Sequence, residues 1–173
     1  MLKPGDPAPE FELESVEGVV RSADLKGKRY VLYFYPADDT PGCTTEACGF
    51  RDRLPEFQKL GIPVFGVSPQ GLDSKRKFAS KYQLNFTLLA DVDHRVAEAF
   101  GAWGERSMYG KKYMGVLRST FVISPDGLIE HVWAKVKPDG HADAVLAYLT
   151  GKPTENHEAT APKRRASKAS RQS

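Results

Sequence analysis

The chain has 173 residues, 40% of them hydrophobic and 27% charged, which is an ordinary composition for one globular domain with a good core. No apolar run approaches the ~20 residues of a membrane span, the first ten residues lack the apolar region of a signal peptide, and two cysteines in C-x4-C spacing make neither a disulfide framework nor a zinc site. We therefore expect a cytoplasmic protein without metal or other cofactor, in which any disulfide is transient and catalytic.

The hydrophobic pattern predicts strands that alternate with helices. Two strands joined by a turn and one capped helical turn open the chain, at 11–14, 19–20 and 22–27. A buried strand at 31–35 then leads to a helix from Pro41 to just before Gly61, with Phe50, Leu54, Phe57 and Leu60 as its apolar stripe. Further strands at 62–67 and 87–90 alternate with helices at 73–82 and 94–100.

The last third predicts a hairpin and a final helix. Residues 124–127, Ser-Pro-Asp-Gly, are a strong turn signal between the apolar runs 120–123 and 128–133. A helix begins at Asp139 or Gly140. The whole pattern predicts an α/β fold, with a mixed central sheet flanked by helices on both faces.

Charge and composition change near the end of the chain. Residues 161–173 contain five Lys or Arg and no acid, whereas all 22 Asp and Glu precede them together with the other 20 Lys and Arg. The part before residue 161 therefore has a net charge of −2. We expect one domain at 1–151 and a basic, disordered tail at 152–173.

Both cysteines lie just after the buried strand at 31–35. Pro36 ends this strand, and Thr40-Pro41 predicts a helix start, with the threonine as N-cap and the proline at the first helical position. Cys43 then falls in the first turn. Unpaired backbone N–H groups and the positive end of the helix dipole favour the thiolate of a cysteine at such a position.

The spacing of Cys43 and Cys48 limits how they can pair. Five residues apart on one α-helix, their Cα atoms are about 8.7 Å apart and their side chains point roughly 140° apart. A disulfide tolerates a Cα separation of at most ~7 Å, so any bond between them requires the first turns to unwind. Gly42 and Gly49 make this unwinding easier, because each weakens the helix by ~1 kcal/mol relative to alanine.

The motif Pro36-Ala-Asp-Asp-Thr40-Pro-Gly-Cys43 resembles the active-site signature of peroxiredoxins, the AhpC/TSA family. Cys48, five residues later, resembles the bacterioferritin comigratory protein or peroxiredoxin Q subfamily. The likeness extends to about residue 150 and includes the ranges 85–89, 100–105 and 115–121.

The resemblance implies a thioredoxin fold with an N-terminal β-hairpin extension. It also implies an antioxidant thiol peroxidase for hydrogen peroxide and alkyl hydroperoxides. Cys43 is then oxidised to a sulfenic acid, Cys48 resolves it as an intramolecular disulfide, and thioredoxin or a similar dithiol reduces this atypical 2-Cys disulfide. The subfamily includes monomers and dimers, and we expect a monomer.

Three further residues have roles implied by the resemblance, and each also has a purely structural explanation. Thr40 hydrogen-bonds the peroxide, or is only a helix cap. Pro36 shields the thiolate from water, or only terminates a strand. Arg118 stabilises the thiolate and the charge on the displaced oxygen, or is a solvated charge at a strand edge. Cys48 itself is an ordinary helical residue if it does not resolve.

Other functions compete with the peroxidase. The basic tail predicts weak, salt-dependent contact with nucleic acid, as in a binding module. A thioredoxin-like disulfide reductase requires C-x2-C, so the C-x4-C spacing argues against it. A chaperone-like role stays open. We interpret the remaining polar and aromatic residues as turn acids (Asp38, Asp39, Asp91, Asp93), a solvated loop (Lys111, Lys112) and core or loop aromatics (Trp103, Tyr109, Trp133).

Overall fold

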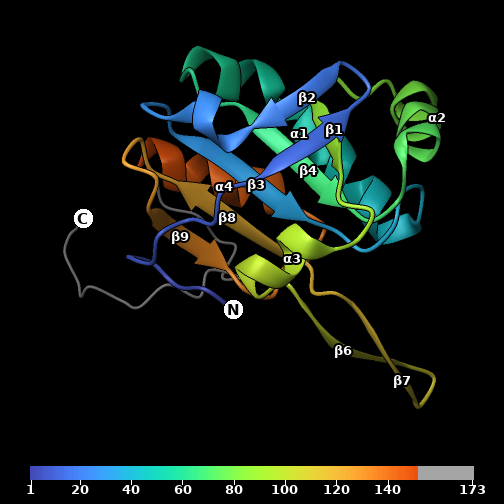
Figure 1. Ribbon diagram of the computed structural model, residues 1–173. Helices are drawn as coiled ribbons and strands as arrows, with labels where there is room; N and C mark the ends of the chain where they lie inside the picture. Colours follow the sequence, from blue (N-terminus) through green and yellow to red (C-terminus); the bar gives the residue numbers. More distant parts are fainter. Residues whose placement is uncertain (152–173) are drawn as a thin grey trace.

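The computed structural model describes residues 1–151 (Figure 1). The tail predicted at 152–173 lies outside the described residues, and so do the disorder and the nucleic-acid contact that were predicted for it. In chain order, the elements are β1 (Glu12–Ser15), β2 (Gly18–Arg21), the 3₁₀ turn η1 (Ser22–Leu25), β3 (Tyr30–Phe34), α1 (Pro41–Lys59), β4 (Val64–Ser68), α2 (Leu72–Tyr82), β5 (Thr87–Ala90), α3 (Arg95–Phe100), β6 (Trp103–Met108), β7 (Lys111–Val116), β8 (Ser119–Ile123), β9 (Ile129–Trp133) and α4 (His141–Thr150).

Seven strands form one mixed sheet in the order β2-β1-β5-β4-β3-β8-β9. Its mixed character confirms the predicted sheet class, whereas the strand order was not predicted. β3 lies parallel to β4 and antiparallel to β8, so Leu32 is registered with Phe65 on one side and with Phe121 on the other. All five residues of β3 are buried. The β1–β2 hairpin forms one edge of the sheet and is the expected N-terminal extension (Figure 1).

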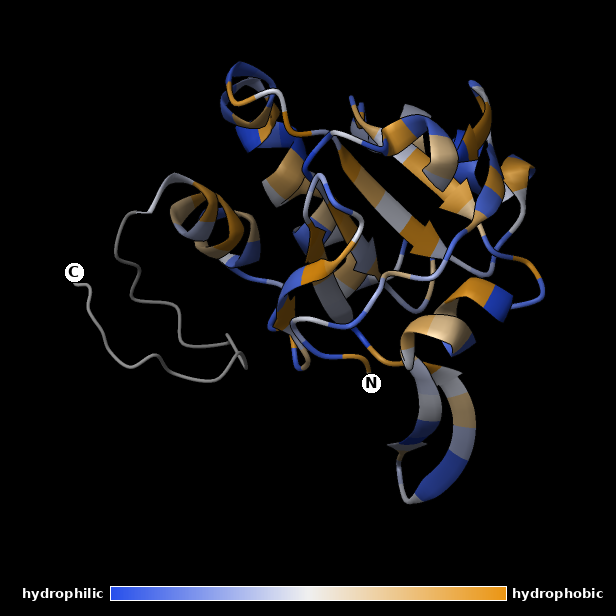
Figure 2. Ribbon diagram, turned by 60° about the vertical axis from the view of Figure 1, so that its left-hand side comes forward, coloured by the Kyte–Doolittle hydropathy of each residue, from blue (hydrophilic) through white to orange (hydrophobic). Residues whose placement is uncertain are grey.

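Two hydrophobic clusters hold the helices on the two faces of the sheet. On one face, α1, α2 and α4 pack over aromatic residues such as Tyr33, which stacks on Phe50 of α1 at a ring distance of 4.7 Å. On the other face, α3 and η1 cover a second cluster in which Phe34 meets Phe121. Figure 2 shows the resulting hydrophobic strands between more polar outer surfaces. The predicted stripe of α1 is buried except for Leu60, which lies just beyond the helix and is exposed.

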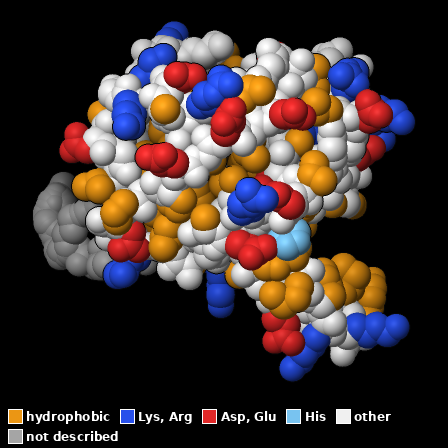
Figure 3. All heavy atoms as spheres, in the orientation of Figure 1, with side chains coloured by type: hydrophobic (Ala, Val, Ile, Leu, Met, Phe, Trp, Pro, Cys, Tyr) orange, Lys and Arg blue, Asp and Glu red, His pale blue; other side chains and the backbone are white. Residues whose placement is uncertain are grey.

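The β6–β7 hairpin was not predicted from the sequence. It projects from the body and carries exposed hydrophobic side chains beside Lys and Arg (Figures 1 and 3). Tyr109 and Gly110 form its turn, and both have positive φ angles of 53° and 80°. Lys111 and Lys112 therefore lie on a strand rather than in the predicted loop. Because neither face of this hairpin packs on the core along most of its length, its residues lack the alternation that marks a half-buried strand.

Candidate active site

The loop between β3 and α1 brings the predicted motif to one end of the sheet. Thr40 occupies the N-cap position of α1 with an extended backbone, and Pro41 is the first helical residue, as predicted. The expected side-chain cap is wrong, however: the Thr40 hydroxyl makes no capping hydrogen bond and donates instead to the Ala37 carbonyl, at 2.9 Å. Its oxygen lone pairs can therefore accept a hydrogen bond from a small molecule at the start of the helix.

Cys43 lies in the first turn of α1, and its side chain is buried in the cluster that contains Tyr33 and Phe50. Backbone N–H groups in a first turn lack helical acceptors, and Thr40 does not take them up with its side chain. These N–H groups and the helix dipole can stabilise a thiolate at this position.

Cys48 lies on the same unbroken helix and is half-buried. Both cysteines are free thiols. Since α1 runs continuously from Pro41 to Lys59, the ideal separation of about 8.7 Å between their Cα atoms applies, and the helix must open before the sulfurs can bond.

Arg118, between β7 and β8, reaches the first turns of α1. Its side chain is 16% exposed, and its Nη1 donates to Oε1 of the fully buried Glu46 at 2.8 Å. Burial pushes the pKa of Arg118 down, but attraction to Glu46 and Cys43 outweighs burial and raises the pKa overall. Arg118 is therefore a fixed, permanently charged partner of the thiol region and not a solvated charge at a strand edge.

Sequence reasoning missed Glu46, although its position offered a signal. It lies three residues after Cys43, and residues three apart share one face of a helix. A buried carboxylate needs a cation, and Arg118 supplies it from a segment 72 positions later in the chain. Glu46 thus fixes the guanidinium beside the thiol.

Gly42 allows Arg118 to lie directly against the helix. A Cβ atom at this residue would be 3.1 Å from Nη2 of Arg118 and 3.4 Å from Cγ of Pro138. These distances are shorter than or at the limit of ordinary contact, so any side chain at Gly42 would displace the arginine or the loop that carries Pro138. The first turn of α1 is therefore covered by both residues.

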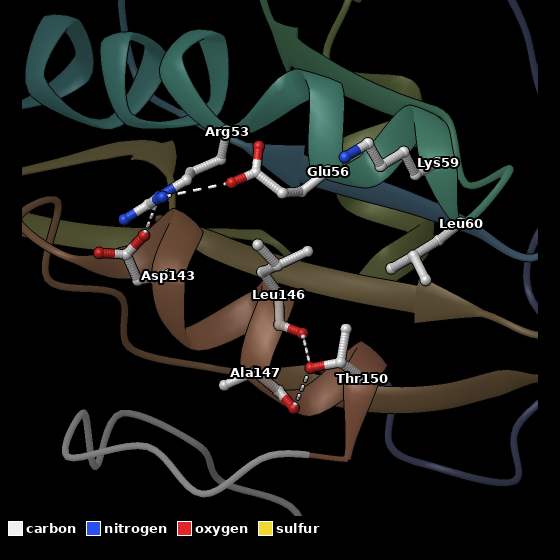
Figure 4. A pocket seen from close by; sticks show the side chains of 8 residues that line it. All are labelled: Arg53, Glu56, Lys59, Leu60, Asp143, Leu146, Ala147 and Thr150. Atoms are coloured by element: carbon white, nitrogen blue, oxygen red, sulfur yellow. Dashed lines mark hydrogen bonds and ion pairs between the residues drawn. The ribbon is translucent and has the colours of Figure 1, made fainter.

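A groove of about 490 Å³ lies between α1 and α4, and neither cysteine is among the residues that line it (Figure 4). At one end, Arg53 bridges the helices, with its Nε 2.7 Å from Oδ1 of Asp143 and its Nη1 3.3 Å from Glu56. Near the start of α4, Ala142 packs against Gly49, where an added Cβ atom would be 3.5 Å from the alanine Cβ. The C-terminal half of α1 thus packs against α4, and opening of the helix can be confined to the turns up to Gly49.

Residues 1–151 contain no cluster of three or more His, Cys, Asp or Glu side chains that could hold a metal ion. Nor is any helix in this described part of the chain long and apolar enough to cross a membrane.

Comparison with known proteins adds relatives over most of the chain. The AhpC/TSA family profile matches residues 4–132. Peroxiredoxin Bcp of Escherichia coli (strain K12) is 48% identical over 149 residues, which cover 86% of this chain and 96% of the relative. Peroxiredoxin Bcp of Bacillus subtilis is 47% identical over 146 residues, which cover 84% and 93%.

Solved structures agree with these relatives. The bacterioferritin comigratory protein of Xanthomonas campestris has a TM-score of 0.77 at 42% identity, and the match covers 82% of this chain and 90% of that one. Peroxidoxin BcpB of Mycobacterium tuberculosis has a TM-score of 0.77 at 38% identity, with 89% and 100% covered. These neighbours confirm the predicted fold class and the predicted resemblance.

Proposed function

This chain belongs to the AhpC/TSA family and is a thiol-dependent peroxidase of the peroxiredoxin type; we propose that Cys43 is its peroxidatic cysteine and Cys48 its resolving cysteine. The observation that carries this assignment is the placement of a free, buried Cys43 in the first turn of α1, beside the fixed charge of Arg118. Residues 1–151 form the catalytic domain in this proposal.

The first step is attack of the Cys43 thiolate on one peroxide oxygen. A sulfur–oxygen bond forms as the oxygen–oxygen bond breaks, and the displaced hydroxide or alkoxide takes a proton to leave as water or alcohol. Arg118 stabilises the negative charge on the displaced oxygen, and Thr40 accepts a hydrogen bond that aligns the peroxide. Pro36 covers the thiolate and keeps water away from it.

The second step joins the two cysteines. After the first turns of α1 open, the Cys48 thiolate attacks the sulfenic sulfur of Cys43, a disulfide forms, and hydroxide leaves and is protonated to water. An external dithiol then reduces the disulfide by two thiol–disulfide exchanges. Opening of α1 is therefore part of each turnover, and its rate competes with further oxidation of the sulfenic acid.

The substrates are peroxides and the electron donor is a thiol. We propose which peroxides and which thiol take part. Alkyl hydroperoxides are accepted besides hydrogen peroxide, because the Xanthomonas campestris relative is described by its alkyl peroxide reduction activity. Thioredoxin is the dithiol, since a disulfide remade in every cycle needs a strong reductant. The same need favours the reducing cytoplasm, and a site built from one chain is compatible with a monomer.

A cysteine variant tests the assignment of the resolving thiol. Cys48→Ser should react once with peroxide at Cys43 and then stop, so that steady turnover with thioredoxin is lost. Turnover is measured as peroxide-dependent consumption of NADPH with thioredoxin and its reductase. Undiminished turnover of this variant would show that Cys48 is a structural residue.

A further inference from the structure

We propose that Lys75 is a positioning residue for the peroxide reaction, which holds the loop 36–40 in the shape that presents Thr40 to the substrate. The inference rests on the proposed function, because it assigns to Lys75 an effect on the step at Cys43. Lys75 belongs to α2 and lies outside the active-site signature.

Lys75 lies at the centre of a buried polar network. Its side chain is fully buried, and Nζ is 2.5 Å from Oγ of Ser68 and 3.4 Å from both carboxylate oxygens of Asp38. It also lies 3.5 Å from the Tyr35 hydroxyl. The Asp38 side chain is only 2% exposed, so the sequence interpretation of this residue as an ordinary turn acid is wrong.

Asp38 is held on the loop by further donors. The Tyr35 hydroxyl donates to one of its carboxylate oxygens at 2.6 Å, and the Ser74 hydroxyl donates to the other at 2.7 Å. Lys75 is the cation of this group. Without it, a buried carboxylate would remain with neutral donors alone, which is costly.

The network continues from Lys75 to the backbone of the loop through two side chains. Ser68 accepts from Lys75 and donates to Oε1 of Gln70 at 2.8 Å. The same Gln70 oxygen accepts the backbone N–H of Asp38 at 3.0 Å, while Nε2 of Gln70 donates to the carbonyl of Pro36 at 3.3 Å. Lys75 therefore supports the backbone on both sides of Ala37.

Ala37 is the residue that orients Thr40. Its carbonyl accepts the Thr40 hydroxyl at 2.9 Å, which directs the lone pairs of that hydroxyl. A shift of the Ala37 peptide would turn the hydroxyl away from the peroxide. The path from Lys75 to the substrate thus runs through Gln70 and Asp38, then Ala37, then Thr40.

The next residue of the loop, Asp39, is also tied to α2, but at the surface. Its carboxylate accepts from the Tyr82 hydroxyl at 2.8 Å and from Nζ of Lys81 at 3.0 Å. Both charged partners are substantially exposed, and such pairs contribute little. The buried contact of Lys75 is therefore the stronger constraint on the loop.

The charge of Lys75 is kept against a cost in stability. Burial lowers the pKa of Lys75 to about 8, although the carboxylates of Asp38 and Asp91 oppose the shift. The pKa of the neighbouring Tyr35 is raised by burial and by Asp38, so this phenol stays neutral in the same range. The buried ammonium therefore lowers the stability of the fold. We attribute its presence to the fixed contacts that it makes with Ser68 and Asp38.

Stopped-flow kinetics test the proposal. The second-order rate constant for reduced protein and hydrogen peroxide is measured from about pH 6.5 to 9.5 for wild type, Lys75→Met and the matched control Lys77→Met on the exposed side of α2. We expect a ratio of wild type to Lys75→Met of about 10 at pH 7, falling toward 1 above pH 9, because wild type then loses the same charge. Lys77→Met should equal wild type.

A second variant covers the case in which Lys75→Met does not fold. The double variant Lys75→Met/Asp38→Asn removes both buried charges and should fold. The ratio of the wild-type rate constant to that of the double variant should again be about 10 at pH 7 and fall toward 1 above pH 9. A ratio near 1 at pH 7, or a ratio that does not change with pH, would overturn the positioning role while leaving the peroxidase intact. A wild type that does not react with peroxide would overturn both.

Discussion

Gly49→Ala is expected to slow disulfide formation without changing the reaction with peroxide. Gly49 follows Cys48 in α1, at the point where the helix meets α4. An added Cβ atom would be 3.5 Å from the Cβ of Ala142, which is an ordinary contact without a clash. Alanine favours a helix by about 1 kcal/mol over glycine, so the substitution stabilises the segment that has to open.

The size of the effect follows from this free energy. Cys48 reaches Cys43 only when the helix opens through position 48, and the adjacent Gly49 leaves its helical conformation in the same step. A stabilisation of about 1 kcal/mol lowers the opened fraction, and with it the resolution rate, about fivefold. Attack on peroxide should be unchanged, because Gly49 contacts neither Thr40 nor Arg118. The variant should also form sulfinic acid at lower peroxide concentrations.

Two kinetic phases separate these effects. Trp133 lies in the same hydrophobic cluster as Cys43, so its fluorescence should report opening of α1. The phase that depends on peroxide concentration reports attack, and the phase that does not depend on it reports resolution. Ser80→Ala on α2 is the matched control, because it raises helix propensity where no cysteine lies. An unchanged second phase in a folded Gly49→Ala would refute the requirement for helix opening.

Three other predictions concern the site and its network. Arg118→Met should lower the second-order rate constant with peroxide at least tenfold, which is a loss of ~1.4 kcal/mol of transition-state stabilisation. The double variant Arg118→Met/Glu46→Gln should be equally slow, and near-wild-type rates would remove Arg118 from the mechanism. Thr40→Val should cost about tenfold, whereas Thr40→Ser should stay within about threefold; equal rates for both would deny the hydroxyl a role. Since the pKa of Lys75 is about 8 when folded and 10.5 when unfolded, the unfolded chain binds more protons between these values, and the free energy of unfolding should rise with pH. The expected rise from pH 8 to about 9.5 is about 1.6 kcal/mol relative to Lys75→Met, and denaturant titrations that find no difference would contradict it.

Local signals in the sequence correctly predicted α1 and the position of Cys43 in its first turn. Thr40-Pro41 located the first turn of α1, and the apolar spacing correctly placed Phe50, Leu54 and Phe57 in the core. Such features depend on neighbours within one or two turns, so they can be recognised without knowing the fold. The turn at 124–127 was predicted for the same reason, and the β8–β9 hairpin confirms it.

Features that depend on distant contacts were missed. Asp38 looked like a loop acid because its cation, Lys75, lies 37 residues away on another helix. Glu46 was not singled out, because its partner Arg118 lies 72 residues away in the chain. The Thr40 hydroxyl can either accept a capping hydrogen bond from a first-turn N–H group of α1 or donate to the Ala37 carbonyl. The shape of the loop decides between these two partners. Burial of a charged side chain is thus a property of tertiary packing that spacing alone does not encode.

In the proposed mechanism, Cys43 reacts with peroxide and Cys48 then closes an intramolecular disulfide. The most direct measurement mixes reduced protein with one equivalent of peroxide in the stopped flow and then counts free thiols, for wild type and Cys43→Ser. We expect a fast phase proportional to peroxide concentration in wild type, loss of both thiols without a covalent dimer, and no such phase in the variant. Slow and equal thiol loss in both proteins would contradict it.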